Sequence, residues 1–367
     1  MNIAILGFGV VGRGVYDILS KDFKDIKVKY ILEKDSNKVK GFEHLLASSF
    51  DQIIHDLEVD VVVELIGGKE IAYEFVKKAI TAKKHVVTAN KALISENFKT
   101  LTHMAISHDV ELLYEASVGG AIILLDPLKQ IRQINQINQI EGILNGSTNF
   151  VLSKVFLEDL SITAALSEAL ELGYLEVGSD DDMLGLDALR KINILSMIAY
   201  QTYIAEKDIL RVPLSHLTDD FINEVKARNC IIKYMAKSRV SSGVLQLNVI
   251  PVIMSKHSSL SSINYEENIV CIYGKYHKKQ TFIGQGAGRY PTASAVIYDL
   301  LTIKNKAKQT LSYDKTYTVN NDIEKHHFLI KTDKSLYKSG LMTFSEVKSL
   351  SGLVCFAKIE EDTYEKL

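Results

Sequence analysis

The chain begins Met1-Asn2-Ile3-Ala4-Ile5-Leu6-Gly7-Phe8-Gly9-Val10-Val11-Gly12, a short apolar run followed by three closely spaced glycines. A helical pattern of apolar residues follows, so this order predicts a strand, a tight glycine turn and a helix. Glycines at this spacing let the backbone approach a pyrophosphate and let the helix pack closely on the strand. The helix N-terminus offers partial positive charge to phosphate groups. We therefore predict that a dinucleotide binds at the turn, through Gly7, Phe8, Gly9, Val10, Val11 and Gly12.

Apolar runs and helical patterns then alternate along the first third of the chain. Strands are expected at 28–32, 59–65, 85–88 and 110–114, and helices notably at 72–82 and 96–108. This alternation predicts the α/β class with a Rossmann-type doubly wound parallel sheet. Glu33 and Lys34 follow the second expected strand, where an acid accepts ribose hydroxyls of NAD and a cation accommodates the 2′-phosphate of NADP. Both are candidate cofactor ligands, so the choice between NAD and NADP stays open.

The sequence pattern changes near Pro127, where we place a domain boundary. Residues 1–130 form the expected dinucleotide-binding domain. Residues 131–283 form an expected α+β domain with a long helical region at 150–172, a helix at 186–200 and strands at 244–249 and 269–273. Residues 284–303 carry a glycine-rich turn and a helix. Residues 304–367 are lysine-rich and are treated as a C-terminal extension.

Composition excludes several classes of protein. The 367 residues include 43 Lys plus Arg and 45 Asp plus Glu, a formal net charge of −2 without a basic stripe, so no nucleic-acid partner is expected. No apolar run approaches the roughly 18 to 20 residues that span a bilayer, so no membrane association is expected. The three cysteines are far apart and form no C-x-x-C pair. We therefore expect a reducing, cytoplasmic compartment.

Three polar motifs follow apolar strands or precede a helix. The first, 88–91 (Thr-Ala-Asn-Lys), lies at the end of an expected strand. A lysine there either faces the ligand crevice of an open α/β sheet or is an ordinary solvated surface residue. The second, 115–120 (Glu-Ala-Ser-Val-Gly-Gly), offers one carboxylate and carbonyl oxygens suited to a hard cation, or is a plain turn. The third, 145–149 (Asn-Gly-Ser-Thr-Asn), suits a polar ligand or a helix cap.

An acidic run leads into the helix expected at 186–200. Within 176–191, Asp187 and Lys191 are four residues apart and would share one helix face. Such a pair, with the preceding acids, can hold a small zwitterion and move a proton. The alternative is a solvated acidic loop with an ordinary surface ion pair.

Six motifs in order give the chain a close resemblance to the homoserine dehydrogenase family over roughly residues 1 to 300. They are 7–12, 88–91, 115–120, 142–150, 185–191 and 286–295. The resemblance implies NAD(P)-dependent interconversion of L-homoserine and L-aspartate 4-semialdehyde, a step between aspartate and threonine, methionine and isoleucine. It also implies that the second domain carries catalysis and that its sheet forms a homodimer.

The resemblance also implies roles for individual residues. Lys191 matches the proton donor to the aldehyde oxygen, and Lys91 matches its catalytic partner near the nicotinamide. Asn90, Lys91 and Gly286 match cofactor-binding positions, so residues 284–303 are expected to return to the dinucleotide-binding domain. The implied substrate-binding residues are Glu176, Asp187, Asp182, Tyr174, Gly146, Ser147 and Thr148. A monovalent cation, sodium, would have a structural role at Glu115, Val118, Gly120 and Ile122.

The chain departs from the family pattern in places. Ala121 and Ile123 stand where the family usually has glycine and proline, and Ser147 and Phe150 replace threonine and tyrosine. The tail after Lys304 is short for the regulatory ACT domain of many members, so it is either a reduced ACT-like element, with a strand at 326–331 and a helix at 344–350, or a structural extension. Rival functions are another amino- or hydroxy-acid dehydrogenase and a non-catalytic nucleotide sensor.

Overall fold

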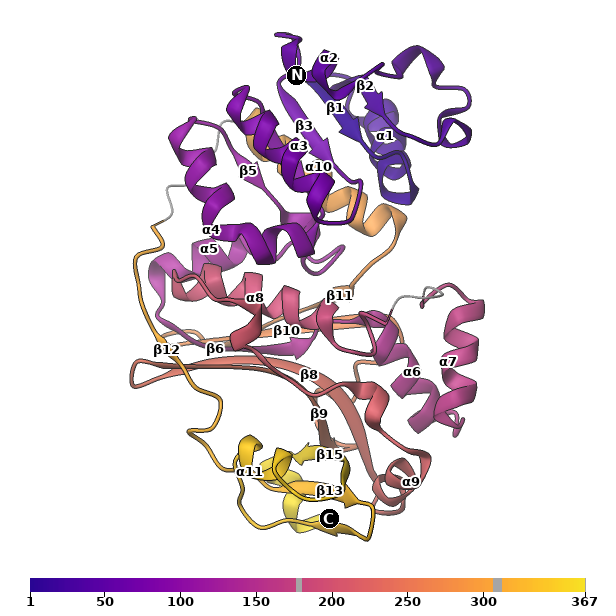
Figure 1. Cartoon of the computed structure of the whole chain (residues 1–367), viewed down its shortest axis with the longest axis vertical. Helices are drawn as coiled ribbons and strands as arrows, with labels where there is room; N and C mark the ends of the chain where they lie inside the picture. The colour runs from indigo at the N-terminus through magenta and orange to yellow at the C-terminus, as the bar shows by residue number, and fades with distance from the viewer. Residues whose placement is uncertain (176–179, 306–311, 367) are drawn as a thin grey trace. The chain divides into compact units, whose positions relative to one another are not determined.

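The computed structural model describes residues 1–175, 180–305 and 312–366. The chain forms two compact units (Figure 1). The first combines Met1–Ile131 with Gln285–Asp314, and the second combines Arg132–Gly284 with Lys315–Leu367. Each unit is therefore assembled from two separate stretches of the chain.

The first unit contains a parallel sheet with the strand order β2-β1-β3-β4-β5. The strands are β1 (Asn2–Leu6), β2 (Lys27–Leu32), β3 (Val61–Glu64), β4 (His85–Thr88) and β5 (Leu112–Leu113). The chain adds β2 on one side of β1 and the later strands on the other. The order therefore reverses between β1 and β3, which is where open α/β sheets bind ligands at the carboxyl ends of their strands. The predicted Rossmann-type α/β class is confirmed.

Six helices accompany this sheet in the described residues. They are α1 (Val10–Asp22), α2 (Phe50–His55), α3 (Glu70–Thr81), α4 (Lys91–Ser107), α5 (Leu125–Ile134) and α10 (Arg289–Lys304). Helix α10 packs on α1 where both carry small residues: a Cβ added to Gly14 would lie 3.1 Å from the Cβ of Ala293. Apolar residues of β1, β3 and α10 share one buried core, which holds the returning segment against the sheet.

The second unit is built on a mixed sheet of ten described strands. They are β6 (Ile137–Ile143), β7 (Leu210–Arg211), β8 (Cys230–Ser241), β9 (Val244–Ser255), β10 (Glu267–Gly274), β11 (Lys278–Gln285), β12 (Thr318–Val319), β13 (Phe328–Thr332), β14 (Leu336–Lys338) and β15 (Leu353–Ile359). The main path is β11-β10-β6-β8-β9-β15-β13-β14. One edge of β9 pairs with β8, while β12, β7 and β15 pair with successive parts of β9. The C-terminal residues thus extend this sheet.

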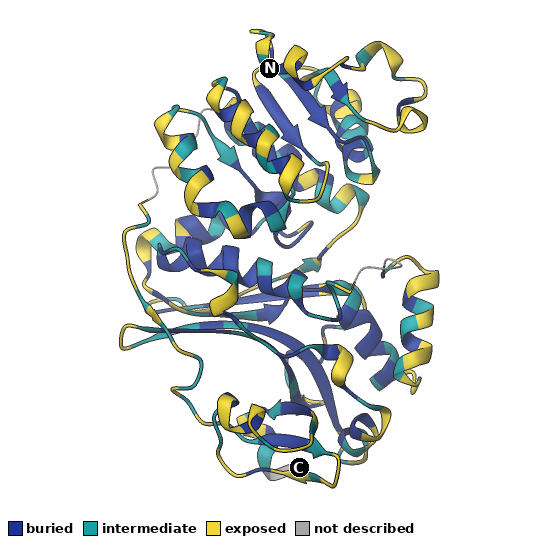
Figure 2. Cartoon of the chain, viewed as in Figure 1, coloured by how far each residue is buried: buried dark blue, intermediate teal, exposed yellow. Residues whose placement is uncertain are grey.

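Helices α6 (Gly146–Leu157), α7 (Ile162–Glu171), α8 (Leu186–Tyr200), α9 (Asp219–Ala227) and α11 (Phe344–Lys348) complete the second unit. Helix α8 is buried along almost its whole length (Figure 2). Charged side chains on such a helix are shielded from water, which sets the conditions for the chemistry described below.

Three expected elements differ from the structure. The single helical region expected at 150–172 is two helices, because Asp159 has a left-handed φ of +59° and Ser161 caps α7 through the Ala164 N–H. Strand β5 is shorter than the expected 110–114, because residues 115–117 form a 3-10 turn. Helix α4 starts at Lys91, ahead of the expected residue 96, because Asn90 caps it. None of the described helices is long and apolar enough to cross a membrane.

Candidate active site

The glycine turn between β1 and α1 has the geometry that the sequence predicted. Gly7 has a φ of +90°, and a Cβ there would lie 2.6 Å from the Leu65 carbonyl oxygen. A Cβ on Gly12 would lie 2.3 Å from the Gly7 oxygen, whereas Gly9 faces open space. Gly9 also caps α1 without a side-chain hydrogen bond, so no side chain occupies the start of the helix. Backbone N–H groups of this helix end are available to phosphate oxygens.

Glu33 lies against the glycine turn. Its Oε2 accepts the Phe8 N–H at 2.8 Å, and its Oε1 accepts the N–H groups of Lys34 at 2.9 Å and Asp35 at 3.1 Å. Partial burial opposes ionisation, but these donors outweigh it and hold the pKa of Glu33 below its ordinary value. The Lys34 side chain is exposed. Of the two predicted cofactor ligands, the acid is the one anchored to the turn.

Lys91 begins α4 at the carboxyl end of β4, as the first polar motif predicted. Asn90 caps the helix by accepting the Leu93 N–H at 3.0 Å and donates to the Gly68 carbonyl at 2.6 Å. Thr88 accepts the Asn90 N–H at 3.0 Å and donates to Glu64 at 2.6 Å. Sequence reasoning missed Glu64, a buried acid that supports the turn carrying Lys91. Its signal was a glutamate at the end of an otherwise apolar strand.

The Glu115 turn binds the N-terminus of α5. Glu115 Oε1 accepts the N–H groups of Leu124 at 2.5 Å and Leu125 at 2.6 Å, and Oε2 accepts that of Asp126 at 3.0 Å. A carboxylate has about four lone-pair sites, so capacity for one further contact remains. Burial raises the pKa of Glu115 in spite of these donors. A cation beside the carboxylate would offset that burial, so the residue fits a monovalent ion as one ligand among carbonyl oxygens.

The other predicted cation and cofactor positions are nearby. Gly120 has a φ of +57°, and a Cβ there would lie 2.5 Å from the Gly286 carbonyl carbon. Ala121 donates its N–H to the Gln285 carbonyl at 3.0 Å. The structure therefore brings Gly120 and Gly286 together. Val118 and Ile122 are buried in the same turn. Within the described residues, no group of three or more His, Cys, Asp or Glu side chains could hold a metal ion.

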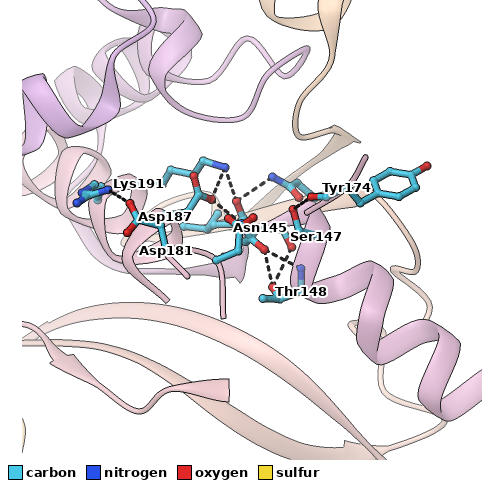
Figure 3. A network of polar contacts seen from close by, with 11 residues as sticks. Asn145, Ser147, Thr148, Tyr174, Asp181, Asp187 and Lys191 are labelled. Atoms are coloured by element: carbon cyan, nitrogen blue, oxygen red, sulfur yellow. Dashed lines mark hydrogen bonds and ion pairs between the residues drawn. The ribbon is translucent and has the colours of Figure 1, made fainter. Parts of the chain in front are cut away.

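In the second unit, α8 presents a buried lysine to two oxygen acceptors (Figure 3). Lys191 Nζ lies 2.8 Å from Asp187 Oδ2 and donates to the Leu144 carbonyl at 2.7 Å. Asp187 is 5% and Lys191 7% exposed. The pair is therefore a buried ion pair on one helix face, and the alternative of a solvated surface pair is wrong.

Asn145 connects this pair to the acidic loop. Its Nδ2 donates to Asp182 at 2.7 Å and to Asp187 at 2.9 Å, and its Oδ1 accepts the N–H and the hydroxyl of Thr148, each at 2.7 Å (Figure 3). Asn145 thereby caps α6 and orients two carboxylates. Our predicted site omitted Asn145, although it opens the motif 145–149. Burial and the nearby charge of Asp187 raise the pKa of Asp182.

A second asparagine, Asn268 on β10, also supports the lysine. Its Nδ2 donates to the Leu144 carbonyl at 3.1 Å, the same oxygen that binds Lys191. Asn268 is 1% exposed. No sequence signal marked it, because its contact with Leu144 joins residues far apart in the chain.

The predicted substrate residues gather at the start of α6. Ser147 donates to the Tyr174 carbonyl at 2.6 Å, and the Tyr174 ring stacks on Phe150 with centroids 4.3 Å apart. A Cβ on Gly146 would lie 3.0 Å from the Glu266 oxygen. Glu176 lies outside the described residues. Asp181, which had no predicted role, pairs with Arg190 at 2.7 Å and fastens the loop to α8.

This arrangement suits a small molecule that carries an ammonium group and exchanges a proton. The buried carboxylate of Asp187 and the half-buried one of Asp182 attract a cation, and Asn145, bonded to Thr148, fixes their geometry. Lys191 offers an ammonium in a site shielded from water. The first unit independently offers a helix N-terminus and an acid suited to a dinucleotide.

Comparison with known proteins gives the same combination. The family model described as homoserine dehydrogenase matches residues 124–301, and that described as its NAD binding domain matches residues 7–115. Homoserine dehydrogenase of Bacillus subtilis is 30% identical over 94% of this chain and 85% of its own length. The Synechocystis enzyme of that name is 35% identical over 83% of this chain and 73% of its own length.

Solved structures agree. A homoserine dehydrogenase from Thiobacillus denitrificans has a TM-score of 0.89 at 24% identity, covering 98% of both chains, and shows the fold. That of Staphylococcus aureus has a TM-score of 0.79 at 28% identity, covering 98% of this chain and 99% of the other. One unit has a glycine turn suited to a dinucleotide, and the other has a buried lysine beside a carboxylate. Because the family models and the relatives also match most of its length, this chain belongs to the homoserine dehydrogenase family of oxidoreductases.

Proposed function

We propose that the chain catalyses reversible, NAD(P)-dependent hydride transfer between L-homoserine and L-aspartate 4-semialdehyde, between aspartate and threonine, methionine and isoleucine. Family membership supports the reaction. The structural observation that most directly supports the proposed reaction is the buried Lys191, held between the Asp187 carboxylate and the Leu144 carbonyl.

Lys191 is the proposed proton donor. The nicotinamide, when bound, supplies the hydride that reduces the aldehyde carbon. Negative charge then grows on the aldehyde oxygen, where a buried ammonium stabilises it and supplies the proton. An ammonium has three N–H groups, and among the described residues two contacts of Lys191 are to Leu144 and Asp187. The third N–H serves the substrate oxygen. In the reverse direction, the neutral amine takes the hydroxyl proton.

Asp182, Asp187 and Glu176 are the proposed ligands of the substrate ammonium. The mutual repulsion of Asp182 and Asp187 supports this role, because a bound ammonium would relieve it. Asn145 acts as a positioning residue, since its amide holds both carboxylates. The proposed substrate site also includes Tyr174, Gly146, Ser147 and Thr148, and their contacts at the start of α6 support that assignment.

The first unit is proposed to bind the dinucleotide through residues 7–12, Glu33, Lys34, Asn90, Lys91 and Gly286. Lys91 is the proposed second catalytic lysine, and its place on α4 at the end of β4 supports this role. A structural sodium ion at Glu115, Val118, Gly120 and Ile122 is supported by the spare acceptor capacity of Glu115.

The same proposal divides the chain by role. Residues 1–130 and 284–303 bind the dinucleotide, residues 131–283 carry catalysis and homodimerisation, and residues 304–367 form an extension. The family resemblance supports the dimer.

The test is production of NADH or NADPH from L-homoserine at alkaline pH, followed by absorbance. We expect turnover with at least one dinucleotide. Lys191→Ala should abolish turnover and leave dinucleotide binding nearly unchanged, because Lys191 belongs to the other unit. Lys207→Ala, which removes an exposed lysine of the same unit, is the matched control and should retain turnover. A folded wild-type protein that turns over with neither dinucleotide contradicts the proposal. Loss of dinucleotide binding in Lys191→Ala shows that the lysine is misassigned.

A further inference from the structure

The Glu33 carboxylate is fixed in the place where the adenosine ribose of a dinucleotide is expected. It follows β2 and accepts the Phe8 N–H of the glycine turn at 2.8 Å. Its other oxygen accepts the N–H groups of Lys34 and Asp35. Swinging the side chain away would leave the part-buried Phe8 N–H without that acceptor, which costs free energy, whereas the exposed N–H groups of Lys34 and Asp35 would turn to water. Turning Glu33 aside to make room for another anion would therefore break its hydrogen bond to the glycine turn.

Hydrogen-bond chemistry at this carboxylate distinguishes the two dinucleotides. An ionised carboxylate only accepts hydrogen bonds and has about four lone-pair sites, three of which are used here. The remaining site suits one ribose hydroxyl, which donates. A 2′-phosphate at neutral pH carries negative charge and offers acceptor oxygens, so it would meet the carboxylate with repulsion and without a hydrogen bond.

The guanidinium of Arg13, beside the glycine turn, is already engaged. Arg13 of α1 lies over the rings of Phe8 and Phe42, with Cζ 5.3 and 4.8 Å from their centroids. Its Nη2 donates to the Lys38 carbonyl at 3.1 Å. Rearranging Arg13 toward a phosphate would break these contacts with the turn and with the loop after β2. Lys34 and Lys38 are exposed and offer only flexible, solvated charges.

We propose that Glu33 makes this chain selective for NAD(H) over NADP(H), by accepting a ribose hydroxyl and excluding the 2′-phosphate. The inference rests on the proposed function, since it concerns the dinucleotide of that reaction. It adds which dinucleotide is used and which residue decides it.

The experiment measures dissociation constants of NADH and NADPH by titrating nicotinamide fluorescence with the full chain, which contains no tryptophan. Two variants remove one negative charge each. Glu33→Gln keeps the length of the side chain and an oxygen for the Phe8 N–H. Asp35→Asn is the matched control, because that carboxylate lies two residues on and accepts the Asn37 N–H at 3.0 Å. Thermal melts confirm that each variant is folded.

We expect the wild type to bind NADH at least about tenfold more tightly than NADPH, since a like-charge contact changes affinity by a factor of about ten or more. Glu33→Gln should reduce that ratio by at least about tenfold, whereas Asp35→Asn should keep it within about twofold. Equal or tighter binding of NADPH by the wild type overturns the inference, and so does an equal response of the two variants. Binding of neither dinucleotide overturns the proposed function itself, which separates the two failures.

Discussion

Gly185 precedes α8 at a position where any side chain should disturb the start of that helix. Its φ is +79°, in the left-handed region that costs other residues about 1 to 2 kcal/mol. A Cβ there would lie 2.0 Å from the Tyr234 hydroxyl oxygen and 2.9 Å from its Cζ. Tyr234 is 2% exposed and donates to the Val212 carbonyl at 2.9 Å, so the ring has little freedom to move.

We expect Gly185→Ala to lower the free energy of unfolding by about 3 to 5 kcal/mol. This sums about 1 to 2 kcal/mol of backbone strain, about 1 to 2 kcal/mol for overpacking, and about 1 kcal/mol for the Tyr234 hydrogen bond. Urea unfolding followed by circular dichroism measures the change. Gly243→Ala is the matched control, because Gly243 has a similar φ of +77° with open space around it, and it should cost only the backbone strain.

A double-mutant cycle tests the cause of the effect. Tyr234→Phe alone should cost about 1 kcal/mol by removing the hydrogen bond to Val212. If the hydroxyl makes the clash, the double variant Gly185→Ala with Tyr234→Phe should be more stable than the sum of the single effects by at least about 1 kcal/mol. Additive losses, or a Gly185→Ala effect no larger than that of Gly243→Ala, would refute the reasoning.

Two further predictions concern polar groups that are wholly or partly shielded from water. Asn145→Ala removes the helix cap of α6 and the donors to Asp182 and Asp187. It should therefore lower the free energy of unfolding in urea by about 2 to 4 kcal/mol and reduce kcat/KM for L-homoserine at least about tenfold. Unchanged kinetics would exclude a positioning role. Burial and the charges of Lys358, Lys237 and Arg239 lower the pKa of His326 from 6.5 to about 3. The unfolded chain therefore binds the extra proton between those values, and stability falls as the pH falls through that window. His326→Leu removes this imidazole, so the stability of the variant should fall less steeply than that of the wild type as the pH is lowered. Urea midpoints measured between pH 7 and 5 test this. If the midpoints of the two proteins change in parallel with pH, His326 does not make this contribution.

Much of the fold was predictable because its signals are local. Glycine spacing, a period of two or of 3.6 residues, and the alternation of strands with helices all act within a few residues. The same holds for Asp187 and Lys191, whose spacing on a helix brings them together without help from the rest of the chain. Their burial was not predictable, since it depends on the sheet against which α8 packs.

The break between α6 and α7 shows the limit of periodicity. The apolar pattern continues through 150–172, but a left-handed residue, Asp159, and the cap at Ser161 divide it. A single aspartate with positive φ leaves little trace in the sequence, because Asp and Asn adopt that conformation only occasionally.

The amino-acid sequence by itself determined the Rossmann-type unit, the dinucleotide turn and the lysine–aspartate pair of α8, because each depends on neighbours within one or two turns of the chain. Only the tertiary structure decided which groups complete the site. Asn145 bonds acids 37 and 42 residues away, Asn268 reaches a carbonyl 124 residues away, and Glu33 closes on Phe8 across 25 residues. Contacts of this kind follow from strand order and helix packing, and no local pattern encodes them.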